Sequence, residues 1–246
     1  MATIYYQNRV EIPLAGVAPV MRQAIVAVED AHRWHAAGEA IDTPRARSRT
    51  PTSALHILHG AVLPLGVIGY KSYTTSREAA RFWVHLFDAT TGRALAVLEG
   101  DYLGMMRTGA TGGLAARLLS NPASNVAGVF GAGWQAQSQI AALCAVREMD
   151  DIQVFARKRD KLEAFCTEQT ARLGRRVRPA ASAEEMVKSA DILVTITTAS
   201  EPLFDGRASE TGAVSRHAAH PLVAALLAAR GIVAARRSRD ETPQPG

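Results

Sequence analysis

The sequence has few cysteines and few aromatic residues. Two of its 246 residues are cysteine, and 6% are aromatic. Cys144 and Cys166 lie far apart and outside any Cys-x-x-Cys or zinc-knuckle spacing, so neither a disulfide scaffold nor a cysteine-based metal centre is implied. We expect both to be reduced thiols, half-buried on helices.

Long apolar runs are also missing. No stretch approaches the roughly 18 apolar residues that a membrane span requires. The first ten residues include Gln7 and Asn8 and contain no apolar core of a secretory signal. With 48% hydrophobic and 21% charged residues, the composition is typical of a globular protein. These features predict a cytoplasmic chain with no membrane partner.

The excess of positive charge is small. Lysine and arginine number 28 against 23 aspartates and glutamates, which gives a net charge of +5. The basic residues do not alternate with aromatic ones, as they do in many nucleic-acid-binding surfaces, so we expect no nucleic-acid partner. The histidine pairs His32/His35, His56/His59 and His217/His220 lack a third ligand at a suitable spacing, and no metal site is predicted.

The first half of the chain mixes helical and strand-like segments. Apolar residues at helical spacing predict an amphipathic helix over 17–34. Residues 40–52 are rich in Thr, Pro, Arg and Ser and indicate a loop. The segments 82–87 and 94–98, joined by the turn 88–92, predict a β-hairpin. This half therefore indicates an α+β domain with an antiparallel sheet.

The second half alternates short apolar runs with helical patterns. Strands are predicted at 126–130, 152–156 and 192–197, and helices at 134–147, 159–173 and 183–190. Such alternation is typical of a parallel sheet with helical crossovers. The fold class expected is α/β: a Rossmann-like parallel sheet domain, incomplete at its C-terminal end, and an N-terminal α+β domain. We place the domains at 1–120 and 121–206, followed by a divergent tail at 207–246.

A glycine motif follows the first strand of the second half. Gly131-Ala132-Gly133-Trp134-Gln135-Ala136 joins a predicted strand to a predicted helix, which is the context of the dinucleotide-binding fingerprint. The first glycine permits a tight turn, the second allows the backbone to approach a pyrophosphate, and the small Ala136 allows close packing of helix on strand. The N-terminus of the helix offers N–H groups and a positive dipole end. We expect these six residues to bind a dinucleotide.

The end of the next strand indicates which dinucleotide. NAD-binding domains place a carboxylate there for the ribose hydroxyls. In this sequence the strand ends in Ala156 and is followed by Arg157, Lys158 and Arg159. Cations suit a 2′-phosphate, and a guanidinium can bind it in a bidentate manner. Arg157 and Lys158 therefore predict a preference for NADP(H), with NAD(H) as the alternative, although a solvated basic loop has the same composition.

Taken together, the motifs resemble the ornithine cyclodeaminase/mu-crystallin family. The resemblance covers residues 39–206, and the segments that carry it in order are Thr43-Pro44-Arg45, Gly69-Tyr70-Lys71, the hairpin 88–100, Arg107-Thr108-Gly109-Ala110, the motif 131–136, Ala190-Asp191-Ile192 and Glu201-Pro202. It implies a dimeric two-domain protein, with a Rossmann domain for NAD(P)(H) and an N-terminal domain for substrate binding and dimerisation. Members oxidise, deaminate or reductively form amino and imino acids.

The resemblance also implies roles for individual residues. Arg45, Lys71 and Arg107 match the family positions that bind the substrate α-carboxylate, for which cationic donors are chemically suited. Arg45 is followed by Arg47 and Arg49, so a solvated basic loop is an alternative for it. Lys71 is expected to end an apolar strand, and Arg107 to precede a glycine-rich helix. Thr197, at the end of the strand 192–197, is expected to contact the cofactor.

The match ends near residue 206. Family members continue with a turn that carries an acid/base aspartate in cyclodeaminases, whereas no aspartate lies between Asp205 and Asp240 here. The Ala- and Arg-rich composition and an ending without a packed element suggest a change of reading frame or length near Ala208. No catalytic residue is assigned, and weak or absent turnover is expected.

The function expected from the sequence is that of an amino- or imino-acid oxidoreductase or cyclodeaminase that uses NAD(P)(H). Hydride transfer would occur at the substrate Cα while Arg and Lys hold the carboxylate. The alternative is a non-catalytic protein that binds NADPH or a small ligand. The partners expected are a small amino or imino acid and, by resemblance, a second copy of the chain.

Overall fold

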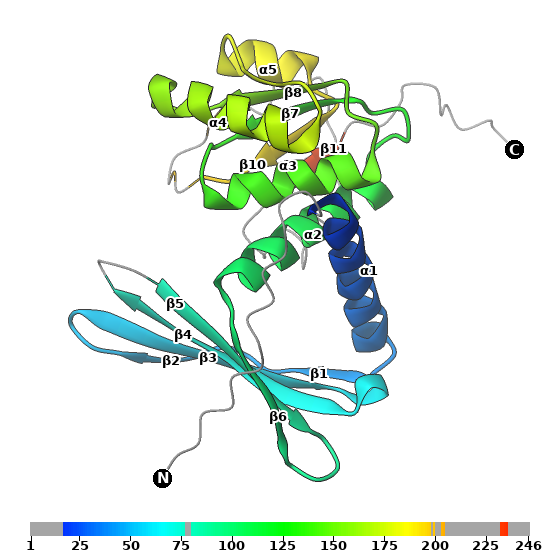
Figure 1. Ribbon diagram of the computed structural model, residues 1–246, viewed down its shortest axis with the longest axis vertical. Coiled ribbons are helices and arrows are strands. Elements are labelled where there is room, and N and C mark those ends of the chain that lie inside the picture. The colour runs from blue at the N-terminus through cyan, green and yellow to red at the C-terminus, as the bar shows by residue number, and fades with distance from the viewer. Residues whose placement is uncertain (1–16, 77–79, 198, 200–202, 205–231, 236–246) are drawn as a thin grey trace, which may run out of the picture. The chain divides into compact units, whose positions relative to one another are not determined.

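The computed structural model describes residues 17–76, 80–197, 199, 203–204 and 232–235 (Figure 1). The chain divides into two compact units, one comprising residues 1–12 and 26–106 and the other residues 13–25 and 107–246. Helices α1 (Val17–Ala36) and α2 (Asp101–Leu119) each contribute residues to both units. The domain limits at residues 120 and 206 stay predictions.

The first unit contains a six-stranded antiparallel sheet. Its strands are β1 (Ala40–Asp42), β2 (Ala46–Arg49), β3 (Ser53–Val62), β4 (Val67–Ser76), β5 (Ala80–Asp88) and β6 (Ala94–Glu99). The order is β1-β3-β4-β5-β6, with β2 also paired to β3 (Figure 1). A short 3-10 helix, η2 (Leu63–Leu65), joins β3 to β4. The expected antiparallel sheet and its hairpin are confirmed.

Two local predictions in this unit are wrong. Residues 40–52 are not a loop, because β1 and β2 lie within them and pair with β3. Edge strands can be rich in polar residues, since one side of an edge strand is not paired with another strand. Lys71 does not end a strand but lies in the middle of β4, opposite Leu58 and Val84.

The turn of the β5–β6 hairpin is held by one carboxylate. Asp88 Oδ1 accepts hydrogen bonds from the backbone N–H groups of Thr90 (3.0 Å) and Thr91 (2.8 Å) and from the Thr91 hydroxyl (2.9 Å). These bonds, first of all that from the Thr91 N–H, lower the pKa of Asp88. Gly92 follows with φ +71°, a left-handed conformation that glycine adopts readily.

The second unit contains a five-stranded sheet, ordered β11-β10-β7-β8-β9. The strands are β7 (Val126–Phe130), β8 (Asp151–Phe155), β9 (Val177–Pro179), β10 (Ile192–Thr195) and β11 (Ile232–Ala235). The parallel arrangement expected for β7, β8 and β10 is confirmed, β9 adds a fourth parallel strand that was not predicted, and β11 pairs antiparallel with β10. The tail therefore contributes a paired strand at residues 232–235, which corrects the expectation of an ending without a packed element.

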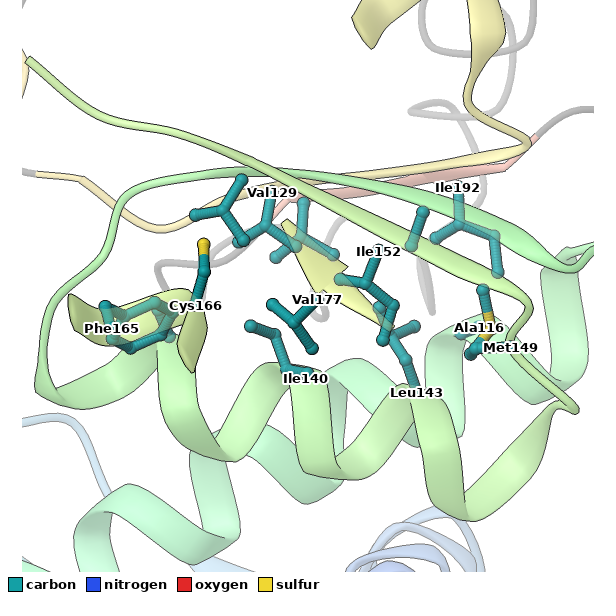
Figure 2. Packing of buried hydrophobic residues seen from close by; sticks show 14 of the residues in the cluster. Ala116, Val129, Ile140, Leu143, Met149, Ile152, Phe165, Cys166, Val177 and Ile192 are labelled. Carbon is teal, nitrogen blue, oxygen red and sulfur yellow. The ribbon is translucent and has the colours of Figure 1, made fainter. Parts of the chain in front are cut away.

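Helices cover both faces of this sheet. On one face, α2, α3 (Trp134–Val146) and α4 (Arg159–Leu173) pack on apolar side chains such as Val129, Ile152 and Ile192. Figure 2 shows Ile140 and Leu143 of α3 among these side chains, between the helix and the strands. On the other face, α5 (Ala183–Ser189) packs on a second cluster that includes Phe130. Two-sided burial explains why these strands are continuous apolar runs in the sequence.

Both cysteines contribute to this packing. Cys144 of α3 is half-buried and Cys166 of α4 is buried, and both are free thiols. Burial raises the pKa of each thiol to about 11. The expectation of reduced helical thiols is confirmed, with Cys166 more deeply buried than expected.

Helix α2 begins earlier than the sequence predicted. It starts at Asp101, so Arg107 lies within the helix rather than before it. The glycines of α2 allow close approach of α3: a Cβ at Gly109 would lie 2.4 Å from the carbonyl oxygen of Ser138. Gln139 of α3 is buried there and donates to the carbonyl oxygen of Thr108 (3.1 Å). Glycine in α2 is thus required for helix contact despite its low helix propensity.

Two polar side chains fix the ends of elements in this unit. The Arg147 guanidinium donates to the carbonyl oxygens of Ala116, Arg117 and Ser120 at the C-terminus of α2. The Asp191 carboxylate accepts from the N–H groups of Asn125 and Val126, both at 3.0 Å, and so ties the start of β7 to the start of β10. These hydrogen bonds explain why an aspartate stands at this position of the segment Ala190-Asp191-Ile192, which carries part of the family resemblance.

Some expectations concern residues outside the described part of the chain. These are Glu201-Pro202, the pair His217/His220, and most of the tail at 207–246. Within the described residues, no group of three or more His, Cys, Asp or Glu side chains could hold a metal ion. None of the described helices combines the length and apolar character needed to cross a membrane.

Candidate functional site

A glycine turn follows the carboxyl end of β7. Gly131 has φ +117°, a conformation that side-chain-bearing residues rarely adopt. Its N–H donates to the Phe155 carbonyl oxygen (2.9 Å), which extends the pairing of β7 with β8. A Cβ at this position would lie 2.4 Å from the carbonyl oxygen of Ile196. Both the backbone conformation and the lack of space therefore require glycine.

The second glycine borders open space. Gly133 is exposed, and a Cβ built on it would meet no atom within 4 Å. It occupies the N-cap position of α3, where no side chain caps the helix and the first turn holds no acidic residue. Helix α5 differs, because the Ser182 hydroxyl accepts from the N–H of Glu185 (3.1 Å). The N-terminus of α3 thus presents backbone N–H groups to an open region, as anion-binding helix ends do.

The remaining motif residues have distinct environments. Trp134 is 54% exposed at the start of α3. Ala136 is fully buried against β7, so its small side chain permits the close packing that the motif predicts. The side-chain oxygen of Gln135 is buried and has no hydrogen-bond partner among the described residues. Ala132 is half-buried.

Thr197 lies beside the glycine turn. The backbone N–H of Ile196 donates to the Phe130 carbonyl oxygen (2.9 Å), which brings the end of β10 next to the end of β7. A Cβ on Gly131 would lie 3.4 Å from the Thr197 methyl carbon. Thr197 is exposed, and its hydroxyl accepts from the N–H of Ala199 (2.9 Å). The structure thus places this residue at the same sheet edge as the glycine motif.

Three cations follow the carboxyl end of β8. Arg157 and Lys158 are exposed, and Lys158 is the N-cap residue of α4. Arg159 forms an ion pair with Glu163 (3.1 Å) one turn along α4. Because β8 is the neighbour of β7 and runs parallel to it, Arg157 and Lys158 follow the same edge of the sheet as the glycine turn.

This edge fits a dinucleotide. The open surface over Gly133 and the uncapped N-terminus of α3 suit a pyrophosphate, and Thr197 borders the turn. The segment 156–159 contains no acidic residue, although an NAD-binding domain places its ribose-binding carboxylate at this position. Cationic residues in that place suit an additional phosphate.

In the first unit, two of the predicted carboxylate-binding residues meet at one ring. The guanidinium carbon of Arg45 lies 5.8 Å from the centroid of the Tyr73 ring. The ammonium nitrogen of Lys71 lies 5.3 Å from the same centroid and 4.7 Å from that of Phe82. These are cation–π distances. Arg45 is exposed and Lys71 is half-buried, so both can reach a ligand anion.

Arg107, the third predicted residue, belongs to the second unit and is an exposed residue of α2. Its backbone carbonyl oxygen accepts from the Thr111 hydroxyl (2.9 Å). The helical position presents its side chain on a surface of α2, whereas Thr108 and Gly109, which follow it, are buried.

The residues around Arg45 and Lys71, the two cations of the first unit, were not predicted from the sequence. In the sequence, His56 stands out only as one of a pair of histidines without a third metal ligand, whereas in the structure it is 9% exposed in β3 and stacks on Tyr73. Pairing of β3 with β4 through the turn at Gly66 would have placed the two rings opposite each other. That signal is a strand register, which composition and spacing do not reveal.

The chain is similar to several proteins whose names indicate reactions of amino or imino acids. Delta(1)-pyrroline-2-carboxylate reductase from Bacillus cereus is 38% identical over 121 residues, covering 49% of this chain and 37% of that protein. The structure of the Thermococcus litoralis Delta(1)-pyrroline-2-carboxylate reductase with NADH and L-proline matches with a TM-score of 0.72 and 28% identity, over 76% of this chain and 61% of that one. An archaeal alanine dehydrogenase dimer with bound NAD matches with a TM-score of 0.73 and 27% identity, over 80% and 63%.

The chain spans less than two thirds of the length of each of these proteins. The resemblance found in the sequence is nevertheless confirmed over most of the chain, since the model of the ornithine cyclodeaminase/mu-crystallin family matches residues 15–215. The antiparallel sheet followed by a Rossmann-like parallel sheet agrees with the solved structures. On these grounds the chain belongs to the ornithine cyclodeaminase/mu-crystallin family.

Proposed function

We propose that this chain binds NADP(H) at the edge of its parallel sheet and that its reaction is hydride transfer at the Cα of a small amino or imino acid, with the weak turnover expected where no acid/base residue is assigned. The observation that carries the proposal is the glycine turn: Gly131 is held in a conformation only glycine adopts easily, and Gly133 leaves open the surface at the uncapped N-terminus of α3. Two matched structures contain NADH or NAD, which supports a nicotinamide dinucleotide as the ligand.

The cationic residues supply the second half of the proposal. Arg45 and Lys71 lie at the Tyr73 ring, and Arg107 is exposed on α2, so each can donate to a carboxylate oxygen. A held carboxylate orients the adjacent Cα, which is the atom that gains or loses hydride. When bound, the nicotinamide supplies or accepts that hydride. Reduction of an imine consumes one reduced dinucleotide and one proton and forms the amine and the oxidised dinucleotide.

The test is binding and turnover measured on the same preparation. NADPH and NADH are titrated by fluorescence, and their oxidation is followed with Delta(1)-pyrroline-2-carboxylate, or with pyruvate and an amine, as substrate. Binding with oxidation supports the proposal. Binding without oxidation selects the alternative of a non-catalytic NADPH-binding protein, and absence of binding contradicts both.

The preference for NADP(H) has its own test. In Arg157→Ala/Lys158→Ala, removal of charge-assisted bonds to a 2′-phosphate is expected to weaken NADPH binding about tenfold or more and to leave NADH binding unchanged. Arg159→Ala is the matched control, because Arg159 is paired with Glu163. Equal losses for both dinucleotides would contradict the assignment.

We also propose a homodimer. The matched archaeal alanine dehydrogenase is a dimer, and symmetric dimers are the commonest soluble homo-oligomers. Light scattering of the purified chain tests this directly: a mass of twice 26.3 kDa is expected.

A further inference from the structure

Three rings form a ladder across one face of the antiparallel sheet. His56 of β3 is directly opposite Tyr73 of β4, which is directly opposite Phe82 of β5. The His56 and Tyr73 ring centroids are 4.3 Å apart with an interplanar angle of 3°, and those of Tyr73 and Phe82 are 4.9 Å apart at 22°. Directly opposed residues share a face of a sheet, so the three rings are stacked side by side.

Both first-unit cations lie against the middle ring of this ladder. Arg45 and Lys71 are on different strands or connections, and what they share is the Tyr73 ring, at 5.8 Å and 5.3 Å. Long cationic side chains have many rotamers, and a ring face selects among them through cation–π attraction. The Tyr73 ring therefore contributes to the placement of both charges, and the Phe82 ring, 4.7 Å from the Lys71 ammonium, contributes to that of Lys71.

His56 in turn restricts Tyr73. It is 9% exposed, and its Nε2 is 3.1 Å from the Thr75 hydroxyl, which fixes the plane of the imidazole. Burial, and then the charges of Arg47, Arg45 and Arg49, lower the pKa of His56. The lowered pKa favours the uncharged imidazole, which stacks on Tyr73 without repelling the guanidinium of Arg45.

We infer that Tyr73 and His56 are positioning residues for carboxylate binding: the His56 imidazole holds the Tyr73 ring, and the ring holds Arg45 and Lys71 in the arrangement that receives the substrate carboxylate. This inference rests on the proposed function, because the carboxylate belongs to the substrate proposed there. Neither residue touches the reacting atoms.

The same sheet contains a matched control on its other face. Tyr70 is directly opposite His85, and their rings stack at 4.5 Å with an interplanar angle of 8°. Tyr70 is an odd number of residues from Tyr73 along β4, so its side chain points to the opposite face. The two tyrosines therefore share residue type, strand and a histidine partner but differ in the face on which they lie.

The experiment compares Tyr73→Leu, Tyr73→Phe and Tyr70→Leu in the full chain. For Tyr73→Leu, loss of two cation–π contacts is expected to raise the KM for Delta(1)-pyrroline-2-carboxylate about tenfold, with kcat and the Kd for NADPH within about twofold of the parent. Tyr73→Phe keeps the ring and is expected to have the KM of the parent chain.

His56→Ala is also expected to raise the KM, whereas His56→Phe keeps a stacking ring and is expected to have the KM of the parent chain. Binding of L-proline, measured by calorimetry, should follow the same order without requiring turnover.

The outcomes separate this inference from the proposed function. If the parent chain binds L-proline and oxidises NADPH but Tyr73→Leu leaves KM unchanged, or Tyr70→Leu raises it equally, the proposed function stands and the positioning role is overturned. If the parent chain neither binds L-proline nor oxidises NADPH, the proposed function fails, and this inference fails with it because it depends on the substrate carboxylate. A change in KM confined to the Tyr73 and His56 variants, with rescue by phenylalanine, supports it.

Discussion

The two sheets of this chain differ in how far their faces are buried. In the parallel sheet, Ile152 of β8 is fully buried, and helices cover both faces. In the antiparallel sheet, Ile68 of β4 is 39% exposed although β4 lies between two other strands. Both faces of the first sheet are packed against helices, and the dinucleotide site proposed above lies at its carboxyl edge. In the second sheet, the proposed carboxylate-binding residues Arg45 and Lys71 lie against the ring ladder on one face.

The sharpest test of this contrast is one substitution made in both sheets. Ile152→Ala is expected to lower the free energy of unfolding by about 3 to 4 kcal/mol, since it leaves a cavity in a packed core. Ile68→Ala removes a side chain that is already partly in water and is expected to cost about 1 kcal/mol. Urea unfolding of the two variants measures the difference. Equal costs would show that the antiparallel sheet is as tightly packed as the parallel one.

A second comparison lies within α2. Gly109→Ala is expected to cost about 2 to 3 kcal/mol, because its Cβ would displace α3. Gly104→Ala has open space around the new methyl group. It is expected to stabilise the chain by about 0.5 to 1 kcal/mol through helix propensity. Thermal unfolding should therefore shift in opposite directions for the two variants, and a shift in the same direction would contradict the close helix contact.

The parallel-sheet unit also depends on polar contacts. Arg147→Ala leaves the carbonyl groups at the C-terminus of α2 without their guanidinium donor and is expected to cost about 1 to 2 kcal/mol. Arg159→Ala, which breaks an exposed ion pair with Glu163, is expected to cost less than about 0.5 kcal/mol. Denaturant unfolding of both variants at one ionic strength provides the measurement. A cost for Arg159→Ala that matches that of Arg147→Ala would contradict a special role for the cap.

The smallest effect is expected in the hairpin of the antiparallel sheet and depends on pH. Because the folded pKa of Asp88 lies below its ordinary value, its stabilisation is complete above that ordinary value and is lost as pH falls through the folded pKa. The difference in melting temperature between the parent chain and Asp88→Ala should thus be present at neutral pH and shrink in acid. Thr90→Ala is the control: the backbone N–H of residue 90 still donates to Asp88, so this variant should show the same change of melting temperature with pH as the parent chain. A difference that does not change with pH would show that the carboxylate charge is irrelevant.

The same contrast explains what the sequence could predict. The strands β7, β8 and β10 are continuous apolar runs, and Gly131 and Gly133 are close together in the chain, so local patterns identified both the sheet and its glycine turn. The strands β1 and β2 were missed because they are only three and four residues long and lie in a segment rich in Thr, Pro, Arg and Ser. The start of α2 was missed because its glycines lower helix propensity, while the contact with α3 that requires them is tertiary.

The candidate site divides in the same way. The residues of the glycine turn follow one another in sequence and could be named in advance. Arg45, His56 and Tyr73 come from separate strands or connections and meet only through the pairing of β2, β3 and β4. A shift of one residue in that pairing would send His56 to the other face, which is why no local pattern revealed the ladder.

The buried thiol of Cys166 gives the molecule an internal reporter, with the half-buried thiol of Cys144 for comparison. Burial raises the pKa of each to about 11, and only the thiolate reacts with alkylating reagents. Because Cys166 is a buried residue of α4, its alkylation requires this helix to separate from the strands beneath it. The rate of modification by iodoacetamide measures how often this side of the parallel sheet opens, without any engineered label.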